Sequence, residues 1–326
     1  MEKNFPRRIA TFVLCLLFLV SFTALALFVT PMVAPKTPEV SEAEIKLQGA
    51  QEKLIFVPIH KPKEALELDA KRAFVYDITT DRLIFLSGEA NTRVYPASIT
   101  KLFTAYVALQ HVETDTVITA GDALTLVGKD SSIADIRWGN KLTVQMLIEG
   151  MLLPSGNDAA CVLGVYIGRS IGGAKLTPTK ALQVFVDEMN KQAKELGLTG
   201  THFTNADGYH HKNHYSTLGD IAKIGKLALE NRVIREAVRQ ETKTVTYVSG
   251  QKKLWESTNF LLNPKSKYYI PTATGLKTGT TDAAGNCLLS SFDVEGRDVI
   301  VGIFGCPTKE GRFVDTLKVV EACIAQ

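Results

Sequence analysis

Hydrophobic and polar positions divide the chain into three parts. Residues 9–29 form a continuous apolar run, and no charged residue occurs between Ile9 and Pro35. As a helix, this run is long enough to cross about 30 Å of hydrocarbon. Residues 31–70 combine prolines with charged side chains and predict a linker. Over residues 71–326 the apolar positions recur with the spacing of strands and helices, which predicts one folded domain.

The body begins and ends with strand patterns and has mostly helical patterns between them. Ala73–Asp77 and Leu83–Leu86 flank a polar turn and predict a hairpin. We expect further strands at 242–248, 286–292 and 299–304, and helices at 98–111, 142–151, 158–166, 181–196, 217–229 and 311–324. This order predicts an α/β protein of the α+β type: an antiparallel sheet flanked by helices, with an inserted helical lobe. A cleft between sheet and lobe is the expected position of a site.

Charges beside the apolar run predict which side of a membrane the body occupies. Lys3, Arg7 and Arg8 precede the run, so the positive-inside rule places the N-terminus in the cytoplasm and the body outside. Residues 1–30 would then be a single-pass anchor in the cell membrane. The alternative is a signal peptide cleaved at the Ala-Leu-Ala sequence of residues 24–26, with the body secreted. Both alternatives export the body.

The charge balance gives no argument for nucleic acid as a partner. The formal net charge is +3, and the first eight residues contribute +2 of it, from Lys3, Arg7 and Arg8 against Glu2. The rest of the chain is therefore close to neutral, whereas domains that bind nucleic acid usually carry a pronounced basic surface.

Neither the cysteines nor the histidines have metal-ligand spacing. The five cysteines include no Cys-x-x-Cys pair, and those after residue 30 lie in hydrophobic sequence, which favours buried free thiols. His202, His210, His211 and His214 gather in a polar stretch, but their spacing fits no common zinc motif. We therefore expect no metal site, and we expect this loop to wall the cleft through its HYST segment.

The first candidate for chemistry is Ser98 with Lys101, in PASITKLFTAYVAL. Residues three apart on a helix share a face. A serine hydroxyl needs a base to become a nucleophile, and a lysine becomes that base when burial and the positive end of a helix lower its pKa. Ser249 and Lys252 have the same spacing, but they lie in a polar, glycine-containing stretch that predicts a β-turn. The apolar helix behind Ser98 therefore selects the first copy.

Two further motifs join it. Ser155-Gly156-Asn157 lies between two apolar helices, where a hydroxyl can relay a proton and an amide can bind a peptide. Lys277-Thr278-Gly279 precedes a clear strand, and a lysine, a hydroxyl and a glycine at a strand edge suit a peptide that ends in a carboxylate. Taken singly, each motif is more often an ordinary helix start, turn or edge strand than a functional site.

Together and in this order, SITK, SGN and KTG resemble the active-site motifs of the penicillin-recognising serine enzymes. The longer segments AFVYDITTDRLIF, LIEGMLLPSGNDAACVL and GLKTGTTDAAGNCLLSSF are similar to the low-molecular-mass penicillin-binding proteins, and most similar to the serine-type D-alanyl-D-alanine carboxypeptidases. The resemblance covers about residues 70–326. It implies a penicillin-binding, β-lactamase-like fold and a D,D-peptidase catalytic domain at 71–326.

The resemblance implies catalytic roles for three side chains. Ser98 would be the acylated nucleophile, Lys101 its general base and Ser155 a proton relay. The reaction would remove the terminal D-Ala from peptidoglycan stem peptides through an acyl-enzyme that water hydrolyses, as part of cell-wall synthesis and the control of cell shape. No metal or organic cofactor is required.

The resemblance also implies how the substrate is bound. Asn157 would bind the substrate amide, while Lys277 and Thr278 would hold the terminal carboxylate beside Gly279. The backbone N–H groups of Thr280 and of the nucleophile would form the oxyanion hole. The implied partners are stem peptides ending in D-Ala–D-Ala, and β-lactam antibiotics as covalent inhibitors.

Two alternatives stay open at this stage. A serine β-lactamase shares the fold and the motifs, but the Glu-x-x-Leu-Asn segment that positions water in class A enzymes does not occur between Asn157 and Lys277. Asp158 follows the second motif, and its position at a helix start suits a cap or a partner of the helix dipole. The second alternative is a non-catalytic cell-wall-binding protein of the same fold, which would not need the intact set of motif residues.

Overall fold

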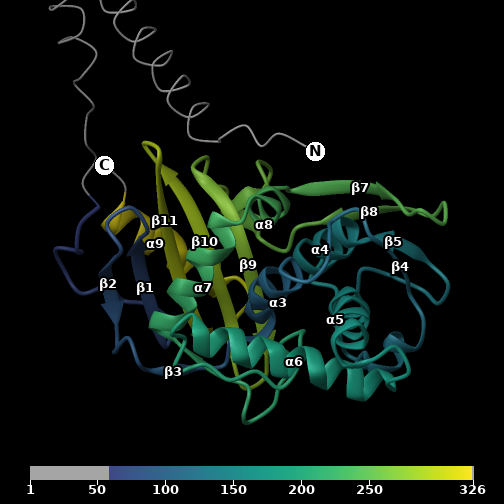
Figure 1. The fold of residues 1–326 in the computed structure, drawn as a ribbon. Helices are drawn as coiled ribbons and strands as arrows, with labels where there is room; N and C mark the ends of the chain where they lie inside the picture. The colour runs from purple at the N-terminus through teal and green to yellow at the C-terminus, as the bar shows by residue number, and fades with distance from the viewer. Residues whose placement is uncertain (1–58, 325–326) are drawn as a thin grey trace, which may run out of the picture. The chain divides into compact units, whose positions relative to one another are not determined.

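An antiparallel sheet of five strands forms the centre of the molecule in the computed structural model, which describes residues 59–324 (Figure 1). The strands are β1 (Arg72–Asp77), β2 (Arg82–Ser87), β9 (Ala273–Thr281), β10 (Gly285–Val294) and β11 (Arg297–Cys306). Their order in the sheet is β2-β1-β11-β10-β9, so β9 forms one edge. Strands from both ends of the body thus share one sheet, which confirms the predicted α+β arrangement.

Side chains on the strands alternate between the two faces of the sheet and pack into two separate hydrophobic cores. Val75 and Val301 point to the face that helix α9 (Gly311–Cys323) covers, where Phe313 and Val319 meet them. Phe74, Ile300 and Leu289 belong to the other core, which the inserted helices share. Both faces of the sheet are covered, so β10 and β11 are buried almost without interruption, and β11 is continuously apolar from Val299 to Phe304.

The inserted lobe is formed by the residues that come between β2 and β9 in the sequence, and it is mainly helical (Figure 1). Its helices are α3 (Thr100–Ala108), α4 (Val144–Leu152), α5 (Asn157–Gly172), α6 (Pro178–Glu195), α7 (Leu218–Glu230) and α8 (Arg232–Val238). Short antiparallel strands join its loops: β3 (Arg93–Val94) with β6 (Ser216–Thr217), β4 (Val117–Thr119) with β5 (Lys141–Thr143), and β7 (Thr242–Thr246) with β8 (Lys252–Glu256).

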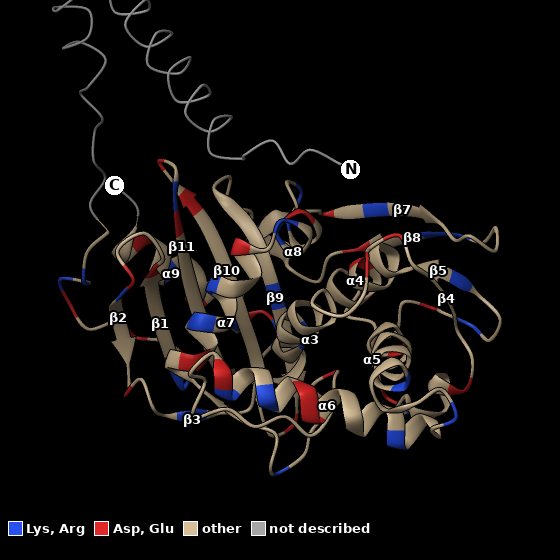
Figure 2. Cartoon of the chain, in the orientation of Figure 1, with Lys and Arg blue, Asp and Glu red and all other residues tan. Residues whose placement is uncertain are grey.

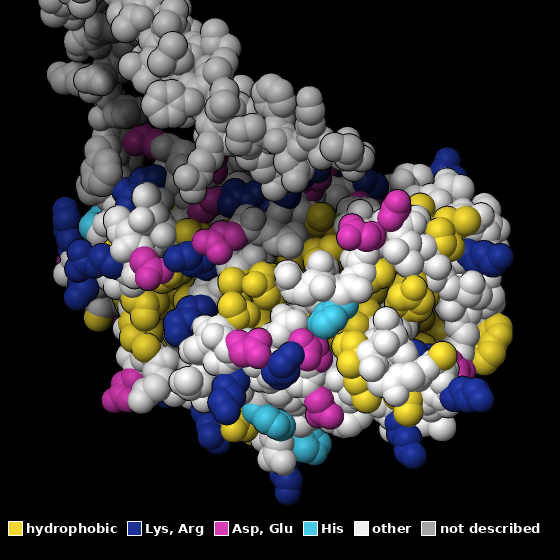
Figure 3. Space-filling model, viewed as in Figure 1, with side chains coloured by type: hydrophobic (Ala, Val, Ile, Leu, Met, Phe, Trp, Pro, Cys, Tyr) yellow, Lys and Arg dark blue, Asp and Glu magenta, His cyan; other side chains and the backbone are white. Residues whose placement is uncertain are grey.

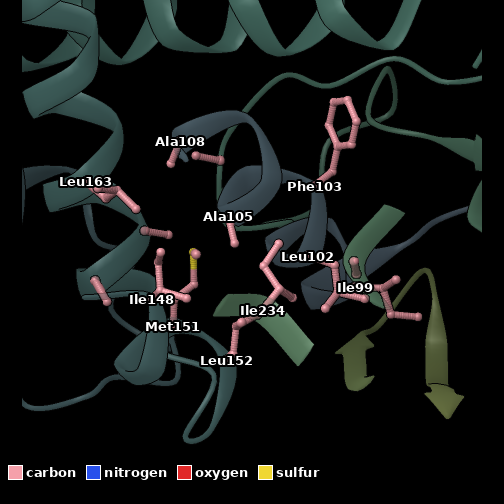
Figure 4. Packing of buried hydrophobic residues seen from close by; sticks show 14 of the residues in the cluster. Ile99, Leu102, Phe103, Ala105, Ala108, Ile148, Met151, Leu152, Leu163 and Ile234 are labelled. Carbon is pink, nitrogen blue, oxygen red and sulfur yellow. The ribbon is translucent and has the colours of Figure 1, made fainter. Parts of the chain in front are cut away.

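Helix α3 lies at the centre of the larger core. Figure 4 shows Leu102 and Ala105 of α3 close to side chains of α4, α5 and α8, among them Met151 and Ile234. Eight of the nine residues of α3 are buried. Such a helix is fixed on all sides, and it begins two residues after Ser98, so the predicted nucleophile is placed on a rigid support.

Several elements differ from the sequence-based expectations. Residues 142–143 belong to β5, and the following helix starts at Val144, where Thr143 accepts a hydrogen bond from the N–H of Met146 at 3.2 Å as its N-cap. Helix α5 continues beyond Tyr166 to Gly172. Strand β8 and helix α8 were not predicted, because both are short and neither has enough periods for a clear pattern.

Residues 59–70, expected as the end of a linker, lie against α9. The N–H of His60 donates to the carbonyl of Cys323 at 3.0 Å, and the N–H of Ala70 donates to the Asp315 carboxylate at 2.7 Å. The Lys318 ammonium donates to the carbonyl of Glu67 at 2.8 Å. The predicted anchor of residues 1–30, the apolar run and linker residues 31–58 lie outside the described residues. Within 59–324, no helix has the length and apolar character needed to cross a membrane.

Acidic and basic side chains are interspersed on the surface. Figure 2 shows both signs along α6 and α7, and Figure 3 shows them mixed with polar atoms over the same face. Cys161, Cys287, Cys306 and Cys323 are buried free thiols, as the apolar sequence around them predicted.

Candidate active site

Ser98 and Lys101 meet at the junction of a 3₁₀ turn (Ala97–Ile99) and helix α3. The Lys101 ammonium donates to Ser98 Oγ at 2.8 Å and to the carbonyl of Asp207 at 2.6 Å. The Lys101 side chain is fully buried, whereas Ser98 is partly exposed. The structure therefore brings a buried amine into contact with a hydroxyl that a ligand can reach.

Burial sets the protonation of Lys101. Removal from water lowers the pKa of its ammonium to about 8, although the nearby Asp207 carboxylate opposes the shift. A base whose pKa lies near neutrality exists partly as the free amine and can still hold a proton once it has accepted one. The pair therefore has the protonation behaviour that an activated serine requires.

Two glycines allow the 3₁₀ turn to pack tightly. A Cβ atom on Gly279 would lie 2.9 Å from the carbonyl oxygen of Pro96, and a Cβ on Gly208 would lie 1.9 Å from that of Ala97. Ala97 has a φ of 47°, a left-handed conformation that costs energy for alanine. The turn before Ser98 is thus held between β9 and the 204–214 loop, and Gly279 is needed for this approach.

The second motif lines the opposite wall of the cleft. Ser155 has a φ of 66° in the turn between α4 and α5, and Asn157 opens α5. The Asn157 amide donates to Ser131 Oγ at 2.9 Å, and its backbone N–H donates to the carbonyl of Ser132 at 2.8 Å. Asn157 and Ser155 are nearly buried and face cavities that also contain Ser98.

Asp158 ties this wall together. Its carboxylate accepts backbone N–H bonds from Ala134 at 2.8 Å and from Ile136 at 2.9 Å, and one from its neighbour Ala159 at 2.9 Å. Burial raises the pKa of the carboxyl, and these N–H bonds oppose the rise. Asp158 therefore holds the 131–136 loop in addition to its place in the first turn of α5.

The third motif lies on edge strand β9. Lys277 is buried, and its ammonium lies 3.2 Å from the carbonyl of Thr278 and 3.4 Å from Thr258 Oγ1. The hydroxyls of Thr278 and Thr258 are 2.6 Å apart. Burial, together with the positive charge of Lys101, holds the pKa of Lys277 well below its usual value. An anion placed here would relieve this electrostatic cost.

Arg312 joins the third motif from α9 and was not identified from the sequence. Its guanidinium donates to Thr280 Oγ1 at 3.1 Å, and the side chain is only 7% exposed. Its Nε has no hydrogen-bond partner among the described residues. Burial lowers the pKa of Arg312, although an arginine stays charged. No local signal marks Arg312, because the fold alone brings the start of α9 beside β9.

Two cavities open on either side of Ser98. One has a volume of about 840 Å³ and contains Ser155, Thr278 and Arg312 in its wall. The other, of about 740 Å³, contains Asn157, Asp207 and Thr280. Lys101 and Lys277 lie behind these walls. Six of the eight residues predicted from the three motifs therefore line one cleft, and Ser98 belongs to the wall of both cavities.

The histidine-containing loop contributes differently from the prediction. Tyr209 and His210 line the 740 Å³ cavity, whereas the HYST segment does not. His214 instead lies behind the site, where its Nε2 is 2.8 Å from Thr100 Oγ1 and its Nδ1 accepts the N–H of Thr204 at 3.2 Å. Burial lowers the pKa of His214 to about 3, so it is neutral. No group of ligating side chains within residues 59–324 has the geometry of a metal site.

Comparison with known proteins places the chain in a family. The model of the D-alanyl-D-alanine carboxypeptidase family matches residues 59–308. The chain belongs to this family. A D-alanyl-D-alanine carboxypeptidase of Streptomyces sp. (strain K15) is 32% identical over 240 residues, which is 71% of this chain and 79% of that protein. The carboxypeptidase DacF of Bacillus subtilis is 29% identical over 82% of this chain, but this chain spans only 65% of its length.

The fold agrees with this assignment. The crystal structure of the Streptomyces DD-transpeptidase superposes with a TM-score of 0.72 at 29% identity, covering 81% of this chain and all of that chain. A carboxypeptidase DacD from Francisella tularensis superposes with a TM-score of 0.68 at 27% identity. The predicted penicillin-binding fold is therefore confirmed for the described body.

Proposed function

We propose that the protein is a serine-type D-alanyl-D-alanine carboxypeptidase that removes the terminal D-Ala from peptidoglycan stem peptides. One observation carries the proposal: the buried Lys101 amine lies 2.8 Å from Ser98 Oγ. A second pair of buried basic side chains belongs to the same site: Arg312 lines the 840 Å³ cavity, and Lys277 lies behind its wall next to Thr278. An activated hydroxyl beside a carboxylate-binding site suits hydrolysis of the last bond of a peptide.

Acylation begins with transfer of the Ser98 proton to Lys101. Ser98 Oγ bonds to the carbonyl carbon of the penultimate D-Ala, and the C–N bond to the terminal D-Ala breaks. The leaving amine takes up a proton, with Ser155 as the relay from Lys101. The backbone N–H groups of Ser98 and Thr280 stabilise the oxyanion. Water then attacks the ester, releases the shortened peptide and returns the proton to Ser98.

Substrate recognition relies on the two ends of the scissile dipeptide. Lys277, Thr278 and Arg312 bind the terminal carboxylate, because cations held out of water are stabilised by an anion that completes their hydrogen bonds. Asn157 binds the amide on the acyl side. A β-lactam presents an amide and a carboxylate in the same order, so we expect it to acylate Ser98 as an inhibitor.

We also propose that residues 1–30 anchor the protein in the cell membrane, that residues 31–70 link this anchor to the body, and that the catalytic domain lies outside the cytoplasm. The proposal rests on the apolar run at 9–29 with Lys3, Arg7 and Arg8 before it. A reporter that works only in the cytoplasm, fused after residue 326, should be silent. An active reporter would reverse the topology, and a mature protein beginning near Leu27 would support signal-peptide cleavage and secretion.

Release of D-Ala tests the enzymatic proposal. Full-length protein in detergent is incubated with a pentapeptide ending in D-Ala–D-Ala, and free D-Ala and the tetrapeptide are measured together. We expect equimolar release over many turnovers, and complete inhibition after one equivalent of penicillin has bound. Multiple-turnover hydrolysis of penicillin without D-Ala release would favour the lactamase, and absence of both reactions would favour the non-catalytic protein.

A further inference from the structure

A smaller, basic cavity lies beside the turn between β9 and β10, next to the cavity that contains Ser98 and Asn157. Its volume is about 270 Å³. The start of β1 and strand β3, which lie at one end of the sheet, form its walls with the β9–β10 turn (Figure 1). We call it the basic pocket and define it by Lys71, Arg72 and Arg93 with Ala283 and Phe304.

The basic pocket carries three cations and no carboxylate in its lining. The Arg93 guanidinium lies 4.0 Å above the centre of the Tyr215 ring, and Arg72 donates to the carbonyl of Lys71. None of the three cations forms an ion pair within the part of the chain that the structure describes. Cations that line a concave surface without acidic partners favour an anionic ligand.

Both walls of the basic pocket continue into the catalytic cleft. Arg93 precedes Ser98 by five residues on one wall, and Ala283 follows Thr280 by three residues on the other. Ala283 lines both the basic pocket and the cavity that contains Ser98. An extended peptide advances about 3.3–3.6 Å per residue, so a group two or three residues before the scissile bond lies about 7–11 Å from the nucleophile. The acyl part of a bound peptide therefore extends well beyond Ser98, and the wall at Ala283 continues from that cavity into the basic pocket.

The basic pocket and the catalytic cavity next to it also differ in charge. Asp130 and Asp282 line the 740 Å³ cavity but not the basic pocket, and Asp130 also lines the 840 Å³ cavity. An anion on the acyl part of a peptide is repelled by these carboxylates and attracted by Arg72 and Arg93 beyond the turn. The arrangement thus directs a negative group out of the catalytic cavity and into the basic pocket.

We infer that the basic pocket is a subsite for a carboxylate on the acyl part of the peptide substrate, two residues before the acylated D-Ala. The inference rests on the proposed function. It concerns a carboxylate of the substrate that the residues of the three motifs do not bind. A carboxylate of the same peptide is favoured over a separate phosphate, because the pocket shares a wall with the catalytic cavity.

The test compares two pentapeptides that both end in D-Ala–D-Ala. In one the second residue carries a free carboxylate, and in the other the same group is a carboxamide. The value of kcat/KM for D-Ala release is measured with full-length wild type, Arg93→Gln and Arg72→Gln. Arg82→Gln is the matched control, because Arg82 is an exposed arginine at the opposite end of β2 from the basic pocket.

We expect wild type to prefer the carboxylate peptide by about 5–10-fold, between the value of a solvent-exposed ion pair and that of a buried charge-assisted hydrogen bond. Arg93→Gln and Arg72→Gln should each reduce this preference to about twofold or less by slowing only the carboxylate peptide. Arg93→Lys, which keeps the charge, should restore most of it, and Arg82→Gln should retain all of it. Equal unfolding midpoints would show that the variants are folded. An unchanged preference in Arg93→Gln and Arg72→Gln would refute the subsite.

Two further arms separate failure of the subsite from failure of the proposed function. Calorimetric binding of both peptides to Ser98→Ala protein measures the preference without any reaction, so a preference that depends on Arg93 supports the subsite even if no D-Ala is released. Equal binding of the two peptides overturns it. If Arg93→Gln instead loses binding to vesicles containing an anionic phospholipid while its peptide preference is unchanged, the pocket is a phosphate-binding surface and the inference is wrong.

Discussion

Replacement of Lys101 by methionine separates chemistry from packing at this site. Methionine has nearly the length of lysine and no charge, so it fills the same buried space without a base. The Lys101 ammonium contacts Ser98 Oγ at 2.8 Å and the carbonyl of Asp207 at 2.6 Å, and the substitution removes both contacts. Loss of a positioned base slows a reaction by about 10²–10⁴-fold. We therefore expect acylation by penicillin and by peptide to fall by that factor.

The free energy of unfolding, unlike the acylation rate, should change little in Lys101→Met. The pKa of Lys101 moves from 10.5 to about 8 on folding, so charging it in the buried site costs of order 3 kcal/mol at pH 7. The substitution removes this cost but also two hydrogen bonds, worth about 1 kcal/mol each. It leaves the Asp207 carbonyl without its donor, which costs about 1 kcal/mol more. The net change is close to zero, so the unfolding midpoint at pH 7 should stay within about 3 °C of wild type.

The pH dependence gives an independent check. Between pH 8 and 10.5 the unfolded chain holds the Lys101 proton and the folded chain does not, so this group makes wild type more stable as pH rises through that window. The free amine also becomes more abundant, from about one tenth at pH 7 to about one half at pH 8. The acylation rate should rise accordingly and level off above pH 8. In Lys101→Met, neither the increase of stability between pH 8 and 10.5 nor the rise of the acylation rate toward pH 8 should occur.

The assay is stopped-flow labelling with a fluorescent penicillin, read beside thermal unfolding of the same samples. Lys252→Met is the matched control, because it alters the second Ser-x-x-Lys copy in the β7–β8 hairpin. It should label at the wild-type rate. If Lys101→Met labels as fast as wild type, Lys101 is not the base. If it unfolds more than 10 °C below wild type, its role is structural and the reasoning fails.

Three further predictions concern the rest of the site. Ser98→Ala should abolish covalent labelling by penicillin while Ser249→Ala leaves it unchanged, and equal labelling of wild type and Ser98→Ala would exclude the nucleophile. Arg312→Leu should raise KM for D-Ala–D-Ala peptides by about 10–100-fold, the value of a charge-assisted contact, and an unchanged KM in steady-state assays would remove Arg312 from carboxylate binding. Because the Asp158 carboxylate is occupied by three backbone N–H groups, it has little capacity to activate water. The penicilloyl-enzyme should therefore persist for many minutes by intact mass, and rapid return of the free enzyme would contradict this.

The sequence predicted the parts of this structure that depend on local patterns. Long apolar strands and the buried helix after Ser98 gave clear periodicity, and the β1–β2 hairpin, β10, β11 and α9 lie where that pattern placed them. The Ser249 copy of the first motif lies in the β7–β8 turn, as its glycine indicated. Context around a motif was therefore as informative as the motif.

The parts that were missed depend on contacts between distant segments. Arg312 reaches Thr280 across 32 positions, and nothing near Arg312 in the sequence announces this contact. The contact between residues 59–70 and α9 is likewise a tertiary one, since Ala70 bonds to Asp315 across 245 positions. The role of Asp158 as a clamp on the 131–136 loop was also not apparent, because its three partners are backbone groups that leave no trace in side-chain pattern.

The position of the covalent intermediate shows directly whether Ser98 is the nucleophile. Full-length protein is mixed with a D-Ala–D-Ala pentapeptide, quenched in acid within milliseconds, digested and mapped by mass spectrometry. We expect a tetrapeptidyl ester on Ser98, formed at the rate of the first release of D-Ala and absent from Lys101→Met. An ester on any other residue, or D-Ala release at full rate without an ester on Ser98, would contradict this role of Ser98.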